Sequence, residues 1–139
     1  MKKGRLLNSE LSGLIASLGH GQSVTVADAG LPIPPGSHRI DLALTEGVPG
    51  FLETLEVLLA EMQVESVIIA EEMASTSPEL YQALMSRIGQ LSSDQGQLVE
   101  VLKVSHEAFK VATKDSMGIV RTGEFTPYAN IILESGVVF

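Results

Sequence analysis

The sequence predicts a single α/β domain, a three-layer α/β/α sandwich around a mixed, mostly parallel sheet. Helical and strand patterns alternate along the chain, which is typical of this class. The continuous apolar run Val67–Ala70 is typical of a buried strand covered by helices on both faces. The final predicted strands lie too close together in sequence for parallel crossovers, so we expect the sheet to be mixed. Because no repeat or long linker interrupts the 139 residues, we expect residues 1–139 to form one domain.

The first elements follow from apolar spacing and from turn residues. Ser9 is expected to cap a helix that ends at Gly19. One face of that helix is formed by Leu11, Leu14, Ile15 and Leu18. A strand over 23–26 and a rigid loop rich in Gly and Pro over 28–36 come next, followed by a short strand over 39–44.

The central third predicts a helix, a buried strand and a second helix. Pro49 opens the first of these helices. Its apolar positions repeat at helical spacing and are Phe51, Leu52, Leu55, Leu58, Leu59 and Met62. After the strand over 67–70, Thr76 and Glu79 fit a capping box for a helix that runs to about Gly89.

The last third predicts four strands and one short helix. Ser105 is expected to cap a helix from His106 to about Lys114. The strands are expected at 98–104, 119–121, 131–133 and 136–139.

Composition excludes several partners. The formal net charge is −8, from 9 Lys and Arg against 17 Asp and Glu, which argues against binding to nucleic acid or to an anionic membrane. No apolar run is long enough to span a membrane, and the absence of cysteine is compatible with the reducing cytoplasm. A positive mean hydropathy of +0.26 in so short a chain favours self-association.

Histidine is the side chain best suited to acid/base chemistry near neutral pH. His20 precedes the first strand and Asp28 follows it, while His106 follows a later strand and begins a helix. Ligands of open α/β sheets collect beyond the carboxyl ends of strands, so these three residues form a candidate constellation. Each of them, taken alone, is more often an ordinary loop residue than a functional one.

Three further residues are candidates for ligand contacts. Tyr128 and Asn130 lie two apart before a strand, so both could face a polyhydroxylated ligand, although packing and turn formation also explain them. Lys110 lies on the same helical face as His106, but most lysines in such positions are simply solvated. The pair Glu71 and Glu72 is expected to lie in a solvated loop.

Other chemistries find no support in the sequence. Gly19, His20 and Gly21 precede a strand rather than follow one, so they do not fit a dinucleotide-binding fingerprint, and there is no phosphate-binding Gly-Lys-Ser/Thr loop. The histidines lack the short spacings of common metal sites, so we expect no metal. We also find no nucleophile-elbow pattern.

Several long blocks of sequence together resemble a known family. These blocks are residues 1–4, 7–9, 18–20, 27–34, 39–44 and 127–133. They closely resemble the RbsD/FucU family of sugar pyranases and mutarotases over the whole length of the chain. The segment from Asp28 to Pro34 is more similar to the pyranase branch than to the fucose branch.

The resemblance implies an isomerase that interconverts the pyranose and furanose forms of D-ribose without a cofactor, ahead of ribose phosphorylation. It implies that His20 is the catalytic acid/base and that the sugar is bound by Asp28, His106, Lys110, Tyr128 and Asn130. It also implies a cytoplasmic homo-oligomer, a decamer of two pentameric rings with sites near subunit boundaries. The alternatives are a mutarotase of another sugar such as L-fucose, or a non-catalytic sugar-binding partner of a ribose transporter.

Overall fold

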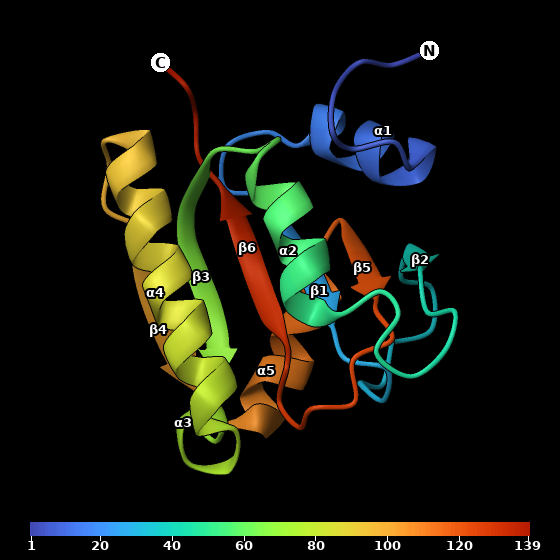
Figure 1. Ribbon diagram of the computed structural model, residues 1–139, viewed down its shortest axis with the longest axis vertical. Coiled ribbons are helices and arrows are strands. Elements are labelled where there is room, and N and C mark those ends of the chain that lie inside the picture. Colours follow the sequence, from blue (N-terminus) through green and yellow to red (C-terminus); the bar gives the residue numbers. More distant parts are fainter.

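A six-stranded mixed sheet lies between two unequal layers of helices in the computed structural model, which describes residues 1–139 (Figure 1). The strands are β1 (Ser23–Ala27), β2 (Arg39–Asp41), β3 (Val64–Ala70), β4 (Glu100–Val104), β5 (Gly118–Arg121) and β6 (Ile131–Ser135). The helices are α1 (Ser9–Ser17), α2 (Phe51–Leu59), α3 (Met73–Thr76), α4 (Pro78–Gln95) and α5 (His106–Ala112), with a 3₁₀ turn at Thr113–Asp115.

The order of strands determines where loops of different regions meet. Across the sheet the order is β2-β5-β1-β6-β3-β4, and only β6 runs antiparallel to its neighbours. The carboxyl ends of the parallel strands therefore lie at the same edge as the amino end of β6. This edge is at the bottom of Figure 1, and both chain termini are at the top.

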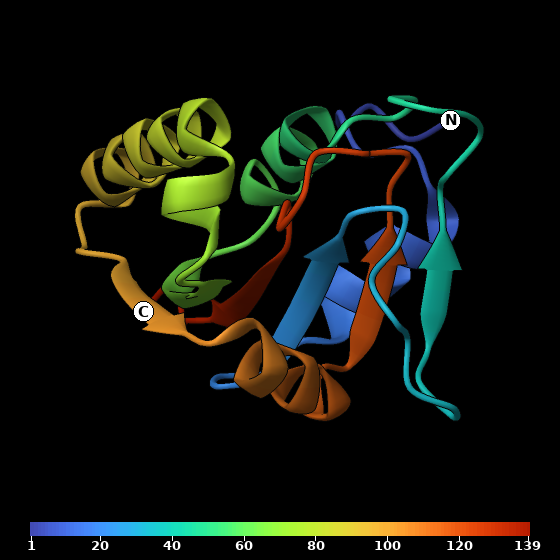
Figure 2. The same cartoon turned by 90° about the horizontal axis from the view of Figure 1, so that it is seen from below.

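Helices cover both faces of the sheet, but not equally. Helices α2 and α4 lie on one face and α5 on the other, as the end view in Figure 2 shows. The larger core cluster combines buried residues of α1, α2 and α4 with Val24, Val26 and Ile131 of the sheet. The smaller cluster packs Phe109 of α5 against Ile119. The predicted three-layer sandwich with a mixed sheet is thus confirmed, although one of its outer layers is thin.

Two predicted helix starts are wrong because the capping contacts differ. Asn8, not Ser9, caps α1, and its Oδ1 accepts the backbone N–H of Leu11 at 2.9 Å. The capping box expected at Thr76 does not form. Instead Ser77 precedes α4, and its hydroxyl donates to the carbonyl of Pro127 at 2.8 Å. The start of α4 is therefore tied to a distant loop, a contact that local sequence does not encode.

Some predicted boundaries also shift. Helix α4 continues past Gly89 and ends where Gly96 adopts the left-handed conformation at φ 69°. The strand expected over 39–44 is confined to Arg39–Asp41, and the helix expected from Pro49 begins at Phe51. Residues 136–139 form no strand, because they continue past the last residues of β6 that pair in the sheet.

Candidate active site

A cavity of about 640 Å³ opens at the edge where the parallel strands end. This volume is within the usual range for small-molecule sites. Asp28 follows β1, His106 begins α5 directly after β4, and Tyr128 precedes β6. The remaining lining residues are Ala29, Gly30, Leu31, Pro32, Thr76, Arg121, Glu124, Phe125, Thr126 and Pro127. The strand order thus brings three of the predicted site residues to one hollow.

Two hydrogen-bonded groups hold the Asp28 carboxylate in place. Its Oδ1 accepts the N–H of Gly30 at 2.9 Å, and its Oδ2 accepts the Asn130 side-chain amide at 2.9 Å. The Asn130 Oδ1 also accepts the backbone N–H of Asp28 at 2.8 Å. Asn130 is fully buried and does not line the cavity, so within one chain it orients Asp28 rather than facing a ligand beside Tyr128.

His106 is held from both sides. Its backbone N–H donates to both carboxylate oxygens of Glu72 at 3.0 Å, and this contact lowers the pKa of Glu72 below its ordinary value. The imidazole meets the ring of Tyr128 edge-on, with centroids 5.0 Å apart, and stacks near Phe109. Its Nδ1 is buried without a hydrogen-bond partner in the chain. Such atoms are uncommon in folded proteins, and this one marks His106 as a functional candidate.

Tyr128 adopts a left-handed backbone conformation with φ 62°, unlike every other residue of the chain except glycines. A non-glycine residue in this region costs about 1 kcal/mol or more, and such strain is concentrated at functional sites. The extended spacing expected for Tyr128 and Asn130 is therefore absent. The two side chains reach different surroundings, which explains why only Tyr128 lines the cavity.

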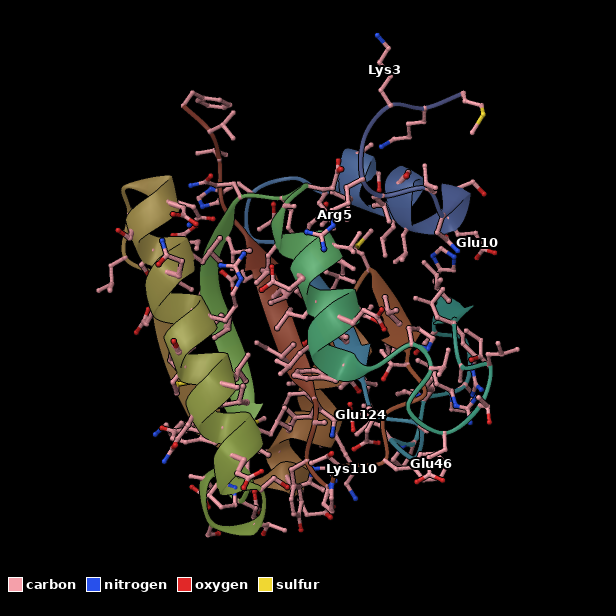
Figure 3. The ribbon with its side chains drawn as sticks, viewed as in Figure 1. Lys3, Arg5, Glu10, Glu46, Lys110 and Glu124 are labelled. Atoms are coloured by element: carbon pink, nitrogen blue, oxygen red, sulfur yellow. The ribbon has the colours of Figure 1, made fainter.

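Glu124 fixes the loop that forms another wall. Its carboxylate accepts the N–H of Phe51 at the start of α2 at 3.1 Å, and the N–H and hydroxyl of Thr126 at 3.1 and 2.7 Å. Burial would raise the pKa of Glu124, but the hydrogen bonds from Thr126 and the backbone outweigh it and lower the pKa. Glu124 lies just beyond the N-terminal end of α2 in Figure 3.

Arg121 supplies the cation at the cavity. Its Nε donates to the carbonyl of Ala29 at 3.0 Å, and one terminal nitrogen lies 3.2 Å from both carboxylate oxygens of Asp41. These contacts connect β5, β2 and the loop that follows Asp28. The guanidinium is thus engaged in contacts within the cavity wall, and its charge is balanced by Asp41.

Lys110 lies outside this cavity. Its ammonium pairs with Glu107 at 2.7 Å and lines a neighbouring cavity with Pro32 and other loop residues. Lys110 and Glu124 are both labelled at the lower end of the molecule in Figure 3. Lys110 lies one helical turn beyond His106, and the cavity that it lines includes Pro32 to Pro35 of the loop over 28–36.

His20 lies at the opposite edge of the sheet from Asp28. The five residues of β1 separate them, about 16 Å of extended chain. The His20 side chain is 61% exposed, and its Nε2 lies 2.6 Å from Glu65 Oε2. His20, Asp28 and His106 therefore do not form one constellation within a single chain, because a strand places the residues before and after it at opposite ends.

The comparisons with known proteins identify the family. A sequence model of the RbsD / FucU transport protein family matches residues 1–138. The chain belongs to this family.

Relatives and solved structures of the RbsD/FucU family match the chain over nearly its whole length. It is 56% identical to the D-ribose pyranase of Vibrio vulnificus strain YJ016 and 58% identical to that of Haemophilus influenzae strain 86-028NP, each over 139 residues that cover 100% of both chains. Bacillus subtilis RbsD complexed with D-ribose superimposes with a TM-score of 0.88 at 48% identity, covering 100% of both chains. The fucose mutarotase of Streptococcus pneumoniae in complex with L-fucose gives 0.73 at 26% identity, covering 95% of this chain and 94% of that one.

Several cavity residues of this RbsD/FucU protein were missed from sequence. Arg121 and Glu124 carried no motif, and Thr76 was considered only as a helix cap; only their positions next to strand or helix ends could have suggested them as site residues. Glu72 was expected to be solvated, but it holds the backbone of His106. No three histidine, aspartate or glutamate side chains gather closely enough to coordinate a metal ion. No helix is long and apolar enough to cross a membrane.

Proposed function

We propose that the chain is a D-ribose pyranase, which interconverts the pyranose and furanose forms of ribose ahead of its phosphorylation. The observation that carries this proposal is the convergence of Asp28, His106 and Tyr128 on one cavity, in a chain that aligns end to end with proteins named D-ribose pyranase. The ribose complex of the Bacillus subtilis relative supports ribose as the sugar.

The reaction opens and recloses a hemiacetal. The bond from the anomeric carbon to the ring oxygen breaks while the carbonyl forms, so one proton reaches the ring oxygen and one leaves the anomeric hydroxyl. Closure through a different hydroxyl reverses these transfers. No atom is oxidised or reduced, so acid/base groups suffice, and one positioned group typically contributes about 10²- to 10⁴-fold.

The residues divide into proton transfer and recognition. We assign proton transfer to His20: on opening, one ring nitrogen takes the proton of the anomeric hydroxyl and donates it to the ring oxygen. On closure, the same nitrogen accepts the proton of the attacking hydroxyl and donates it to the carbonyl oxygen. Asp28, His106 and Tyr128 hold the hydroxyls, because converging donors and acceptors are the best recognition for a neutral polyol. Asn130 acts through Asp28, because the oxygen and the nitrogen of its side-chain amide both form hydrogen bonds to that residue.

The separation of His20 from the cavity favours a site completed by two copies of the chain. In this arrangement His20 of one copy reaches the cavity of its neighbour. Phe125 supports an interface here, because it lines the cavity and is 62% exposed. We propose a homo-oligomer, a decamer of two pentameric rings as the family resemblance implies, located in the cytoplasm where ribose phosphorylation consumes the product.

The test is the rate of exchange between the ring forms of ribose, measured by NMR on the oligomeric protein. Wild type should accelerate exchange, and His20→Ala should lose about a hundredfold or more of that acceleration. Retained ribose binding without any acceleration by wild type would instead support a binding partner of a transporter. Acceleration with L-fucose but not with ribose would support a mutarotase.

A further inference from the structure

The residue assigned to proton transfer makes a short contact outside the cavity. His20 Nε2 and Glu65 Oε2 are 2.6 Å apart, although 45 positions separate these residues in sequence. This is the only hydrogen bond or ion pair of the His20 ring. The other surface histidine pair, His38 with Glu10, is 3.8 Å apart and makes no hydrogen bond. The contact to Glu65 is therefore closer than a loose surface ion pair.

A β-bulge directs Glu65 toward His20. Where β3 pairs with β6, Val64 lies opposite Ser135 and Ser66 lies opposite Glu134, so Glu65 is the extra residue in the ladder. The bulge also lets Val64 and Val67 enter the same core cluster, although strict alternation would place residues three apart on opposite faces. Bulges commonly redirect a side chain next to a site.

The end of β6 holds both partners in place. On one side the N–H of Gly21 donates to the carbonyl of Ser135 at 2.9 Å, and the N–H of Ser135 donates to the carbonyl of Gln22 at 2.8 Å. On the other side the N–H of Gly136 donates to the carbonyl of Gln63 at 3.0 Å. The His20 loop and the bulge therefore share one backbone support.

The backbone of Gly136 passes beside the base of the Glu65 side chain. A Cβ added to Gly136 would lie 3.3 Å from the Glu65 Cβ, tighter than ordinary contact. On the His20 side, the N–H of Gly19 donates to the Gln22 Oε1 at 2.7 Å and closes the loop around the histidine. Both side chains thus start from restrained backbone positions.

We propose that Glu65 is the positioning residue for His20: it fixes the imidazole in the Nε2–H form and leaves Nδ1 to exchange protons with the sugar. A carboxylate only accepts hydrogen bonds, so the nitrogen facing it carries the hydrogen. The hydrogen bond at one ring nitrogen determines which form the other adopts. This inference rests on the proposed function, in which His20 is the acid/base group.

Exchange measurements on three variants test the catalytic consequence. Glu65→Ala should lower the acceleration of ribose exchange about tenfold to a hundredfold, the size of loss seen when the residue that orients a metal-bound histidine is removed. Its ribose dissociation constant should stay unchanged, because Glu65 contacts His20 and not the residues assigned to bind the sugar hydroxyls. The acceleration by Glu65→Gln should fall by less than that by Glu65→Ala, since the amide oxygen still accepts a hydrogen bond. Glu134→Gln is the matched control: it removes the same charge beside the bulge and should retain wild-type exchange.

Nitrogen-15 NMR of the histidine rings tests the contact itself. Wild type should show His20 as the Nε2–H form at a pH where the ring is neutral. Glu65→Ala should show a mixture of both forms, while His38 should not change. A role of Glu65 in stability alone would leave the ring form of His20 unaltered.

The inference is overturned if Glu65→Ala exchanges ribose at the wild-type rate, or if its His20 keeps the wild-type ring form. It is also overturned if Glu134→Gln loses as much activity as the Glu65 variants. Should Glu65→Ala fail to fold, Glu65→Gln preserves the side-chain volume and carries both tests. If wild type itself does not accelerate exchange, the proposed function fails, whereas the NMR result still decides the contact.

Discussion

At the scale of single residues, carboxylates hold the cavity together by accepting backbone N–H groups. Glu72 accepts from His106, Glu124 from Phe51 and Thr126, and Asp28 from Gly30. Charged hydrogen bonds of this kind are stronger than neutral ones. The acidic side chains that argue against polyanionic partners therefore have a second role: three of them accept the hydrogen bonds that hold the site together.

Glu124 makes the free energy of unfolding depend on pH in the acid range. Its pKa is lowered in the folded protein from an ordinary value near 4.5, so the contribution to stability is complete above that value and is lost as the pH falls through the lowered pKa. Glu124→Gln should lower the free energy of unfolding at neutral pH by about 1–3 kcal/mol. It should also flatten the decline of stability below about pH 4.5. Urea unfolding across this pH range measures both effects.

A glutamate on the same side of the molecule provides the control. Glu46 is exposed and makes no hydrogen bond or ion pair, and it is labelled with Glu124 in Figure 3. Glu46→Gln should leave the pH profile as in wild type. An equally steep acid decline in Glu124→Gln would contradict the assignment of that decline to this carboxylate.

The residue types of the site were readable from sequence, but their partners were not. Asp28 and His106 stand out because each follows a strand, and the strand order does bring them to one edge. The position of Asn130 beneath Asp28 depends on a bend at Tyr128 with positive φ, which no spacing rule anticipates. The partner of His20 depends on a bulge in β3, which only the pairing of the strands determines.

At the scale of elements, apolar periodicity was a better guide than glycine. Leu84, Ile88 and Leu91 continue one buried face through Gly89, so α4 does not stop there. The strand expected over 136–139 does not form, because these residues lie past the paired part of β6. Strand positions depend on partners from distant sequence, whereas helical faces are encoded locally.

Two helix caps separate stability from function. Ser105 accepts the N–H of Ala108 at 3.2 Å and caps α5, whose first residue is His106, while Asn8 caps α1 far from the cavity. Ser105→Ala and Asn8→Ala should each lower the free energy of unfolding by about 1 kcal/mol. Only Ser105→Ala should also weaken ribose binding, because it loosens the turn that carries His106. Urea unfolding and calorimetric titration with ribose make the comparison; equal losses of affinity would refute a special role of this cap.

At the scale of the whole molecule, the sheet places the two halves of the proposed chemistry at opposite edges. His20 and Glu65 lie at the amino ends of the parallel strands, and Asp28 and His106 lie beyond their carboxyl ends. A strand that separates two residues cannot bring them together within one copy. A second copy can bring them together if the amino ends of its parallel strands lie against the first copy's cavity. Exposed apolar residues such as Phe125 suit such a contact.

Mixing two inactive variants tests this arrangement. His20→Ala retains an intact cavity, and Asp28→Asn retains His20, so each alone should be nearly inactive in ribose exchange. If His20 of one copy reaches the cavity of another, co-assembly of equal amounts pairs an intact His20 with an intact cavity at about a quarter of the contacts. The mixture should then recover about a quarter of the wild-type activity. If both groups act within one copy, the mixture stays as inactive as its parts. Mixing His20→Ala with Glu65→Ala serves as the control. In that mixture every intact His20 belongs to a copy without Glu65, so the recovered activity should be far smaller than in the mixture with Asp28→Asn.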